Sequence, residues 1–196
     1  MSQRSSGYDR KERDAYQTPA WVTDAIAPHL RELGVTSVWE PAAGNGKMVT
    51  ALRDYGFSVI GTDVLDGNDF LNCCAPPATY DAIVTNPPYG EQNRIALKFV
   101  ERALEYTKSR QGAVAMLLKV DFDSGKTRSH VFAECPAFVG KVVLTERITW
   151  FEPKIASPSD NHAWHLWSWR HVGRPTISYA PTPKAAISRA GMMPPV

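Results

Sequence analysis

The chain has 196 residues, of which 43% are hydrophobic, so it suits one domain with a core and leaves little room for a second. Its net charge of +2 gives no strong overall attraction to nucleic acid, and its apolar runs are too short to span a bilayer. The first residues lack the apolar segment of a secretory signal, and the three cysteines lack zinc-site spacing. We therefore expect a cytoplasmic protein without a metal.

The N-terminal part begins with a polar, charged segment at residues 1–14, which we expect to be disordered. Thr18 followed by Pro19 is typical of a helix N-cap and a proline in the first turn. Apolar residues at helical spacing follow, and Gly34 is a typical helix-ending residue. The sequence therefore predicts a helix between Thr18 and Gly34.

Strands and helices then alternate along the middle of the chain. Each predicted strand is short and apolar, and each predicted helix carries apolar side chains on one face. The predicted strands are 35–39, 57–62, 80–85 and 113–118, and the predicted helices are 45–56, 95–104 and a short one at 127–133.

Two more apolar segments, 139–144 and 163–169, are predicted strands joined by a loop rich in Pro and Ser at 151–161. No helix separates them, so we expect them to pair antiparallel at the sheet edge, because parallel neighbours need a longer crossover. Proline is frequent in residues 173–196 and acidic residues are absent there, so we expect an irregular, basic tail.

The alternation of strands and helices predicts a doubly wound α/β fold, with a mostly parallel sheet and an antiparallel strand near its C-terminal edge. The predicted domain occupies residues 15–172. In such sheets, ligands bind beyond the carboxyl ends of the strands. The segments that follow the predicted strands therefore hold the candidate site residues.

The first of these segments is Glu40-Pro41-Ala42-Ala43-Gly44-Asn45-Gly46, whose two glycines allow a tight turn close to a ligand. Asp63 follows the second strand, where a carboxylate can accept both hydroxyls of a ribose. Val49 replaces the third glycine of a dinucleotide-binding motif, and Glu40 would repel a pyrophosphate. The charge favours a cationic cofactor such as S-adenosylmethionine. The alternatives are that Glu40 braces the loop and that Asp63 is a turn residue.

The strongest pattern is Asn86-Pro87-Pro88-Tyr89, directly after a predicted buried strand. The two prolines restrict the backbone and stiffen the turn. The Asn86 side-chain oxygen and the Pro87 carbonyl are acceptors that can orient the lone pair of an amino group toward an electrophile. Tyr89 can stack on a planar base or amide. The alternative is a strand-ending turn with a partly buried tyrosine.

Together these motifs resemble the amino-methyltransferases of the class I S-adenosylmethionine-dependent fold. Tyr16-Gln17-Thr18-Pro19 resembles the N-terminal cofactor motif of adenine-specific (N6) DNA methyltransferases, and Asp69-Phe70 resembles their third motif. The resemblance covers about residues 15–170 and implies direct methyl transfer to the adenine amino group. It implies that the catalytic residues are Asn86, Pro87, Pro88 and Tyr89. It implies that the cofactor-binding residues are Tyr16, Gln17, Thr18, Pro19, Glu40, Pro41, Ala42, Gly44, Gly46, Asp63, Val64, Asp69, Phe70 and Asn86.

The partner that this resemblance implies is DNA, duplex or single-stranded, and a base in a duplex must be flipped out to react. The flipped adenine would stack on Tyr89. A late aromatic residue is a candidate for its other face, although core packing is the favoured interpretation for each candidate. These candidates are Trp150, Phe151, His162 and Trp164. Candidates for phosphate contacts, with plain surface charge as the alternative, are Lys119, Lys126, Arg128, Arg147 and Lys154.

Sequence-specific DNA methyltransferases usually carry a target recognition domain, for which this chain has no room. The small form resembles enzymes of bacteriophages and prophages, and a short site, low specificity, a homodimer or an accessory recognition partner would account for the missing domain. One rival interpretation is methylation of another planar nitrogen, in structured RNA or in a glutamine of a release factor. Another is a non-catalytic nucleic-acid-binding module on the same fold. The early Tyr16 motif favours DNA, and the intact Asn86 argues against the module.

Overall fold

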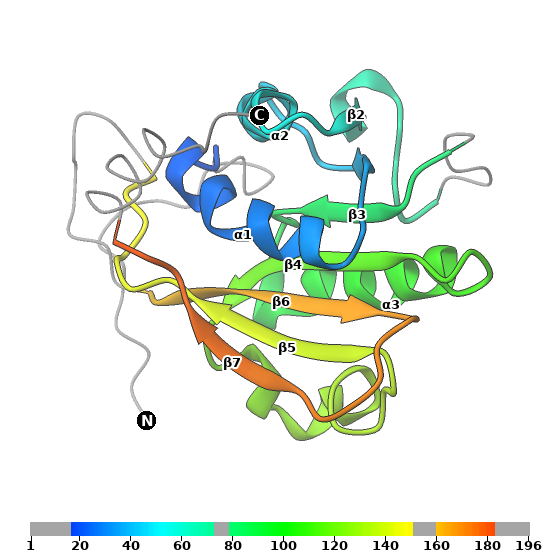
Figure 1. Ribbon diagram of the computed structural model, residues 1–196. Coiled ribbons are helices and arrows are strands. Elements are labelled where there is room, and N and C mark those ends of the chain that lie inside the picture. Colours follow the sequence, from blue (N-terminus) through cyan, green and yellow to red (C-terminus); the bar gives the residue numbers. More distant parts are fainter. Residues whose placement is uncertain (1–16, 73–78, 151–159, 183–196) are drawn as a thin grey trace.

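The computed structural model describes residues 17–72, 79–150 and 160–182, and these form one seven-stranded sheet with helices on both faces (Figure 1). The strand order is β2-β1-β3-β4-β6-β5-β7. The strands are β1 (Ser37–Glu40), β2 (Ser58–Gly61), β3 (Ala82–Thr85), β4 (Ala113–Lys119), β5 (Phe138–Val143), β6 (His162–Ser168) and β7 (Thr176–Tyr179). The helices are α1 (Ala20–Glu32), α2 (Lys47–Asp54) and α3 (Arg94–Lys108), with 3-10 turns η2 (Val64–Asp66), η3 (Glu91–Asn93), η4 (Phe122–Ser124) and η5 (Lys126–Val131).

The direction of the strands agrees with the predicted fold class. β6 is antiparallel to both of its neighbours, β4 and β5, and every other neighbouring pair is parallel. The doubly wound, mostly parallel sheet is therefore confirmed, as is the antiparallel pairing of β5 with β6. β6 is inserted between β4 and β5, so the antiparallel strand lies near the C-terminal edge, with β5 and β7 outside it.

Apolar side chains form a core on each face of the sheet. α1 and α2 cover one face with residues such as Leu30 and Leu52, and α3 with η4 and η5 covers the other, where Val100 and Phe122 are buried. Each such side chain contributes about 1.5–3 kcal/mol by leaving water. β4 lies between the two layers, so six of its seven residues are buried and its sequence is an unbroken apolar run.

The N-terminus of α1 differs from the prediction. Its N-cap is Pro19, which is extended and makes no side-chain capping hydrogen bond, and the helix begins at Ala20. The prediction that Thr18 caps this helix is therefore wrong. Thr18 is 5% exposed and lines a cavity instead. The short helix expected at 127–133 is the 3-10 turn η5.

The irregular tail expected from residue 173 is wrong for its first part, because β7 extends the sheet beyond residue 172. β7 pairs in parallel with β5, and the Ala180 N–H donates to the Val143 carbonyl at 2.9 Å. β7 is an edge strand, and Ile177 and Tyr179 are 60% and 69% exposed. The predictions for residues 1–14 and 183–196 lie outside the described residues.

The described ranges contain no helix with both the length and the apolar character needed to cross a membrane. In the same ranges, no group of three or more His, Cys, Asp or Glu side chains is arranged to hold a metal ion. Cys135 is a free thiol, and Cys73 and Cys74 lie outside the described residues.

Candidate active site

A cavity of about 670 Å³ lies beyond the carboxyl ends of β1, β2 and β3. This is the edge at which doubly wound sheets bind ligands, and the volume is in the range of small-molecule sites. The residues that line it are Gln17, Thr18, Glu40, Pro41, Ala42, Ala43, Gly44, Asn45, Met48, Asp63, Val64, Leu65, Asn68, Asp69, Phe70, Leu71, Asn86, Pro88, Ile95 and Phe99.

The turn between β1 and α2 forms the floor of the cavity. Gly44 has a φ of +54°, a left-handed conformation that favours glycine, and its N–H donates to Asp63 Oδ2 at 2.8 Å. A Cβ at residue 44 would lie 2.7 Å from Gln17 Nε2, so Gln17 packs directly on the turn. The Gln17 Oε1 also accepts from the Asn45 N–H at 3.2 Å. The backbone conformation therefore favours glycine at residue 44, and a larger residue there would displace the end of the Gln17 side chain.

Glu40 is a buried carboxylate at the end of β1, with 1% of its surface exposed. Its Oε1 accepts from the Ala42 N–H at 3.1 Å and from the Thr85 hydroxyl, whereas its buried Oε2 has no hydrogen-bond partner among the described residues. Burial raises the pKa of Glu40 to about 8, a rise that the two hydrogen bonds oppose and nearby Asp63 increases. A cation placed in the cavity would compensate for this desolvation.

Asp63 and Asp69 shape the loops on the other side of the cavity. Asp63 Oδ1 accepts from the Leu65 N–H at 2.9 Å, and Asp69 Oδ1 accepts from the Leu71 N–H at 3.0 Å. Asp69 Oδ2 also accepts from the Asn72 side-chain amide at 2.7 Å. A carboxylate has about four acceptor positions, so both residues retain capacity to accept from a ligand.

An apolar wall lies beside these carboxylates. Phe70 is 3% exposed and packs against Trp39 and Phe99, with ring centroids 5.2 Å and 4.8 Å away. Val64 and Leu65 line the cavity with 52% and 66% of their surfaces exposed, so they offer apolar surface to a ligand. Such a wall suits a flat, weakly polar ring.

The Asn86-Pro87-Pro88-Tyr89 turn follows β3 and reaches the same cavity through Asn86 and Pro88. Its position is fixed on two sides. The Tyr89 hydroxyl donates to the Leu117 carbonyl of β4 at 3.1 Å, and the Tyr89 carbonyl accepts from Ile95 at the start of α3 at 3.2 Å. Thr85, one residue before Asn86, donates to Glu40. Asn86 and Glu40 are therefore held together in one cavity.

Most of the residues predicted to bind cofactor or substrate line this cavity. Those that do are Gln17, Thr18, Glu40, Pro41, Ala42, Gly44, Asp63, Val64, Asp69, Phe70, Asn86 and Pro88. Four that do not are Pro19, Gly46, Pro87 and Tyr89. Tyr16 lies outside the described residues.

Thr85, Ile95 and Phe99 belong to the site but were not predicted from the sequence. Thr85 is fully buried, and a polar residue that closes an apolar strand was the available signal. Ile95 and Phe99 lie on α3, and no sequence pattern connected this helix with the cavity. Their contribution depends on how α3 packs, which helical periodicity does not define.

The late aromatic residues have different environments. Trp164 is fully buried and its indole N–H donates to the Val22 carbonyl of α1 at 2.7 Å, so it is a core residue and cannot stack on a base. The His162 ring lies near Tyr89 and Trp150, with centroids 6.3 Å and 5.4 Å away. Burial lowers the pKa of His162 to about 4, so the ring is neutral at pH 7. Phe151 lies outside the described residues.

The candidate phosphate-binding residues are mostly engaged within the protein. Lys119 pairs with Asp160 at 3.3 Å, and Arg128 donates to the Phe122 carbonyl at 2.6 Å. Arg147 donates to the Asn161 side chain at 3.0 Å. Lys126 is exposed, and Lys154 lies outside the described residues.

Comparison with known proteins identifies the fold. No protein-family model and no curated protein matches the sequence. A solved structure of a putative class I S-adenosylmethionine-dependent methyltransferase from Listeria monocytogenes matches with a TM-score of 0.62 and 16% identity, over 90% of this chain and 70% of that chain. The fold is that of the class I S-adenosylmethionine-dependent methyltransferases.

Other methyltransferases with this fold act in different contexts. A type I restriction-modification methyltransferase subunit from Streptococcus thermophilus matches with a TM-score of 0.58 and 16% identity, over 81% of this chain and 46% of that chain. A putative RNA methyltransferase from Pyrococcus horikoshii matches with a TM-score of 0.59 and 16% identity, over 78% of this chain and 87% of that chain. These similarities establish the class I methyltransferase fold, and the substrate has to be argued from the site.

The residues of the cavity fit S-adenosylmethionine. The buried Glu40 Oε2 suits a cationic ammonium, because an ion pair would compensate for an otherwise desolvated carboxylate. The Asp63 and Asp69 oxygens suit polar groups of a nucleoside, and the wall of Val64, Leu65 and Phe70 suits its base. The cavity therefore offers a place for each chemical part of this cofactor.

Proposed function

We propose that this protein is an S-adenosylmethionine-dependent methyltransferase that modifies the N6 amino group of adenine in DNA. The observation that carries the proposal is that Asn86 and Glu40 line one cavity, linked through Thr85. An acceptor for the substrate amine and a carboxylate for a cationic cofactor are thus within one site.

In this proposal, some residues of the cavity bind the cofactor and Asn86 binds the substrate. When bound, S-adenosylmethionine supplies a methyl group on a good leaving group, so no covalent enzyme intermediate is needed. Glu40 binds the cationic end of the cofactor, and Phe70 with Val64 packs on its base. The Asn86 side-chain oxygen accepts a hydrogen bond from the substrate amine and directs its lone pair toward the glycine turn. Orientation and electrostatics are the protein's contributions.

Two observations favour DNA as the substrate. Gln17 and Thr18 of the Tyr16-Gln17-Thr18-Pro19 motif line the cavity, and this motif resembles one of adenine-specific DNA methyltransferases. Type I restriction-modification methyltransferase subunits from Streptococcus thermophilus and Vibrio vulnificus are among the structural neighbours.

The test is a direct methylation assay. The protein is incubated with labelled S-adenosylmethionine and, in separate reactions, unmethylated duplex DNA, single-stranded DNA, structured RNA and a release factor. Mass spectrometry then identifies the modified nucleoside or residue. We expect N6-methyladenine in DNA. A methyl group found only in RNA or in protein overturns the assignment of DNA as the substrate but supports methyltransferase activity. Cofactor binding without transfer to any of these substrates favours a non-catalytic module.

A further inference from the structure

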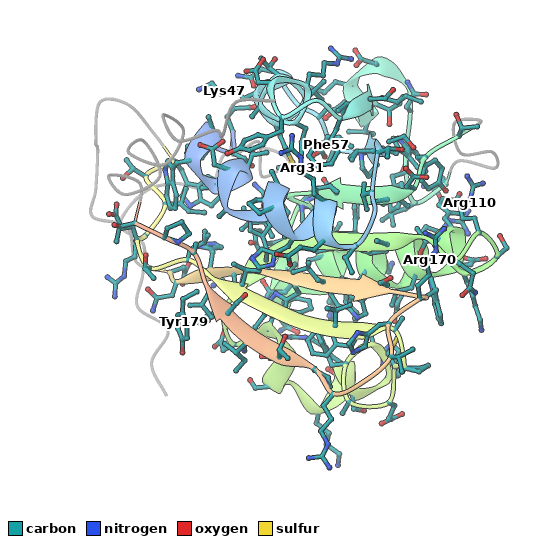
Figure 2. The ribbon with its side chains drawn as sticks, viewed as in Figure 1. Arg31, Lys47, Phe57, Arg110, Arg170 and Tyr179 are labelled. Atoms are coloured by element: carbon teal, nitrogen blue, oxygen red, sulfur yellow. The ribbon has the colours of Figure 1, made fainter. Side chains whose placement is uncertain are left out.

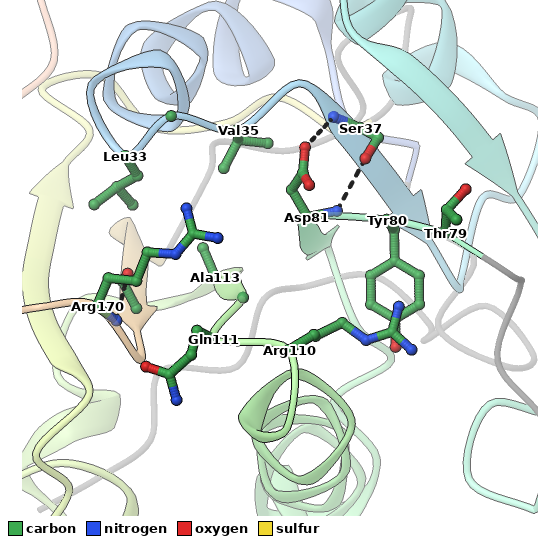
Figure 3. A pocket seen from close by; sticks show the side chains of 13 residues that line it. Leu33, Val35, Ser37, Thr79, Tyr80, Asp81, Arg110, Gln111, Ala113 and Arg170 are labelled. Carbon is green, nitrogen blue, oxygen red and sulfur yellow. Dashed lines mark hydrogen bonds between the residues drawn. The ribbon is translucent and has the colours of Figure 1, made fainter.

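A second, smaller cavity of about 220 Å³ lies at the opposite edge of the sheet, where β1, β3 and β4 begin and β6 ends (Figure 3). The four residues of β1 separate the two edges by roughly 13 Å. This pocket therefore shares no lining residue with the methyltransferase cavity.

The pocket is lined by two arginines from separate loops. Arg110 follows α3 and Arg170 follows β6, and Figure 2 shows both side chains at the same end of the sheet. Arg110 is held over the ring of Tyr80, with 4.3 Å between its guanidinium carbon and the ring centroid. Asp81 is the other charged residue of the lining, so the pocket carries a formal charge of +1.

The Asp81 carboxylate is committed to the protein rather than to the arginines. One of its oxygens accepts from the Thr36 N–H, the Thr36 hydroxyl and the Ser37 N–H at 2.7–2.8 Å. Burial raises the pKa of Asp81, but the hydrogen bonds from Thr36 and Ser37 outweigh burial and lower it to about 2. Asp81 therefore joins β1 to β3 as an ionised, hydrogen-bonded group.

The two guanidinium groups have no ion pair or hydrogen bond within the described ranges. Other arginines at this edge are engaged: Arg31 donates to the Tyr55 carbonyl, and Arg53 donates to the Val59 carbonyl at 2.9 Å. Arg110 and Arg170 are both exposed at the mouth of the pocket, so a ligand can reach them from solvent.

The loops that carry the arginines are fixed relative to each other. The Trp169 N–H donates to the Gly112 carbonyl at 3.1 Å, and the Ala113 N–H donates to the Asp81 carbonyl at 2.9 Å. A Cβ at residue 112 would lie 2.7 Å from that Asp81 carbonyl, so the loop approaches β3 as closely as glycine permits. A fixed backbone reduces the entropy lost when the arginines bind a common ligand.

We propose that Arg110 and Arg170 form a binding site for a phosphate group, at the opposite edge of the sheet from the methyltransferase cavity. Guanidinium groups offer planar pairs of N–H donors that match phosphate oxygens, and two of them outweigh the single Asp81 carboxylate. The pocket has room for a phosphate with part of its substituent. The phosphate is carried by a small molecule or by the 5′ end of a nucleic acid strand.

Binding is measured by isothermal titration calorimetry in phosphate-free buffer, without S-adenosylmethionine. The probes are inorganic phosphate, adenosine monophosphate and a matched pair of short oligonucleotides with a 5′-phosphate or a 5′-hydroxyl. The variants are Arg110→Gln, Arg170→Gln and the double variant. The control is Arg102→Gln, because Arg102 also lies over a tyrosine ring, at 4.4 Å from Tyr106, but pairs with Glu105 and does not line the pocket.

We expect each single pocket variant to weaken phosphate binding about tenfold, the double variant to abolish it and the control to retain it. Tighter binding of the 5′-phosphorylated oligonucleotide than of its 5′-hydroxyl partner, lost in the double variant, supports the site and assigns it to strand ends. Binding of inorganic phosphate or adenosine monophosphate, but of neither oligonucleotide, supports the site and assigns it to small molecules. No phosphate binding by the wild-type protein, or equal binding by wild-type protein and double variant, overturns the proposal.

Discussion

Thr85 and Asn86 are consecutive residues at the end of β3 with different roles. Thr85 donates to Glu40, and Asn86 lines the cavity from the end of β3. Changing Asn86 therefore tests the substrate side without removing the cofactor contacts of Glu40.

We expect Asn86→Ala to retain S-adenosylmethionine binding but to lose about 100-fold or more in kcat, because the amine loses the acceptor that orients it. Asn86→Asp retains an acceptor oxygen at the same place and should keep more activity than Asn86→Ala. Calorimetry gives cofactor affinity, and methyl transfer to DNA gives kcat. Near-wild-type turnover by Asn86→Ala would show that another group orients the amine.

The second prediction concerns Glu40 and the stability of the free protein. Its pKa is about 8 in the folded chain against 4.5 for the ordinary group, so ionisation opposes folding. The free energy of unfolding should therefore fall as pH rises through this interval, by up to about 1.4 kcal/mol per pH unit. Melting curves of wild-type protein and Glu40→Gln at several pH values test this, and the variant should gain relative stability toward pH 8. Asp66→Asn, at an exposed carboxylate, should run parallel to wild type.

The third prediction follows from the same carboxylate when a cation binds. Glu40 is mostly protonated at pH 7 in the free protein, and a cationic ligand favours its ionised form. Binding of S-adenosylmethionine at pH 7 should therefore release close to one proton from Glu40. Calorimetry in two buffers of different ionisation enthalpy measures the release, and the difference between wild type and Glu40→Gln isolates this group. Equal proton release in both proteins would show that Glu40 does not lose a proton when S-adenosylmethionine binds.

The site residues were predicted from the sequence because of where they stand, at or just after the end of a predicted strand. Glu40, Asp63 and Asn86 were found because each follows an apolar segment, and all three line the cavity. The internal partners of these groups could not be predicted, because the Asp63 bond to Gly44 and the Thr85 bond to Glu40 join residues 19 and 45 positions apart. Such contacts depend on the packing of neighbouring strands.

At the scale of elements, the glycine turn between β1 and α2 provides the fourth prediction. Gly44→Ala adds a Cβ against Gln17 in a left-handed conformation. We expect a loss of about 1–2 kcal/mol in stability from the conformation, and about tenfold weaker S-adenosylmethionine binding from displacement of Gln17. Urea unfolding and calorimetry measure the two effects.

Gly34→Ala is the matched control for this change. Gly34 also has a positive φ, +72°, but nothing lies within 4 Å of a Cβ built there, and it follows α1 outside the cavity. Its substitution should cost similar stability and leave cofactor affinity unchanged. If both variants lost affinity equally, general destabilisation and not the contact with Gln17 would explain the result.

Element prediction succeeded where periodicity was strong. The apolar run of β4 gave its bounds within one residue, and the helical spacing located α3, which continues four residues beyond its predicted end. β7 was missed because its four residues are mostly exposed and lie in a segment rich in proline, so burial left no pattern in the sequence. For Trp164 the sequence favoured core packing over a base contact, and its indole indeed joins β6 to α1 within the core.

At the scale of the whole molecule, β7 decides where the sheet ends. Ending the chain after residue 174 removes β7 and exposes the edge of β5, whereas ending it after residue 182 keeps both strands. We expect the shorter protein to lose about 2 kcal/mol or more relative to the longer one, because it also loses the buried Ala180 and its bond to Val143. Urea midpoints compare the two, and identical midpoints would mean that β7 adds nothing to stability.

β3 connects the two cavities of the molecule. Asp81 lines the pocket before this strand, and Asn86 lines the other cavity after it, so only the four residues of β3 separate them. β3 is paired with β1 on one side and with β4 on the other, so both ends of this short path belong to the centre of the sheet. Any thermodynamic linkage between two bound molecules must be equal in both directions, and the amide resonances of Ile83 and Val84 are where it can be observed.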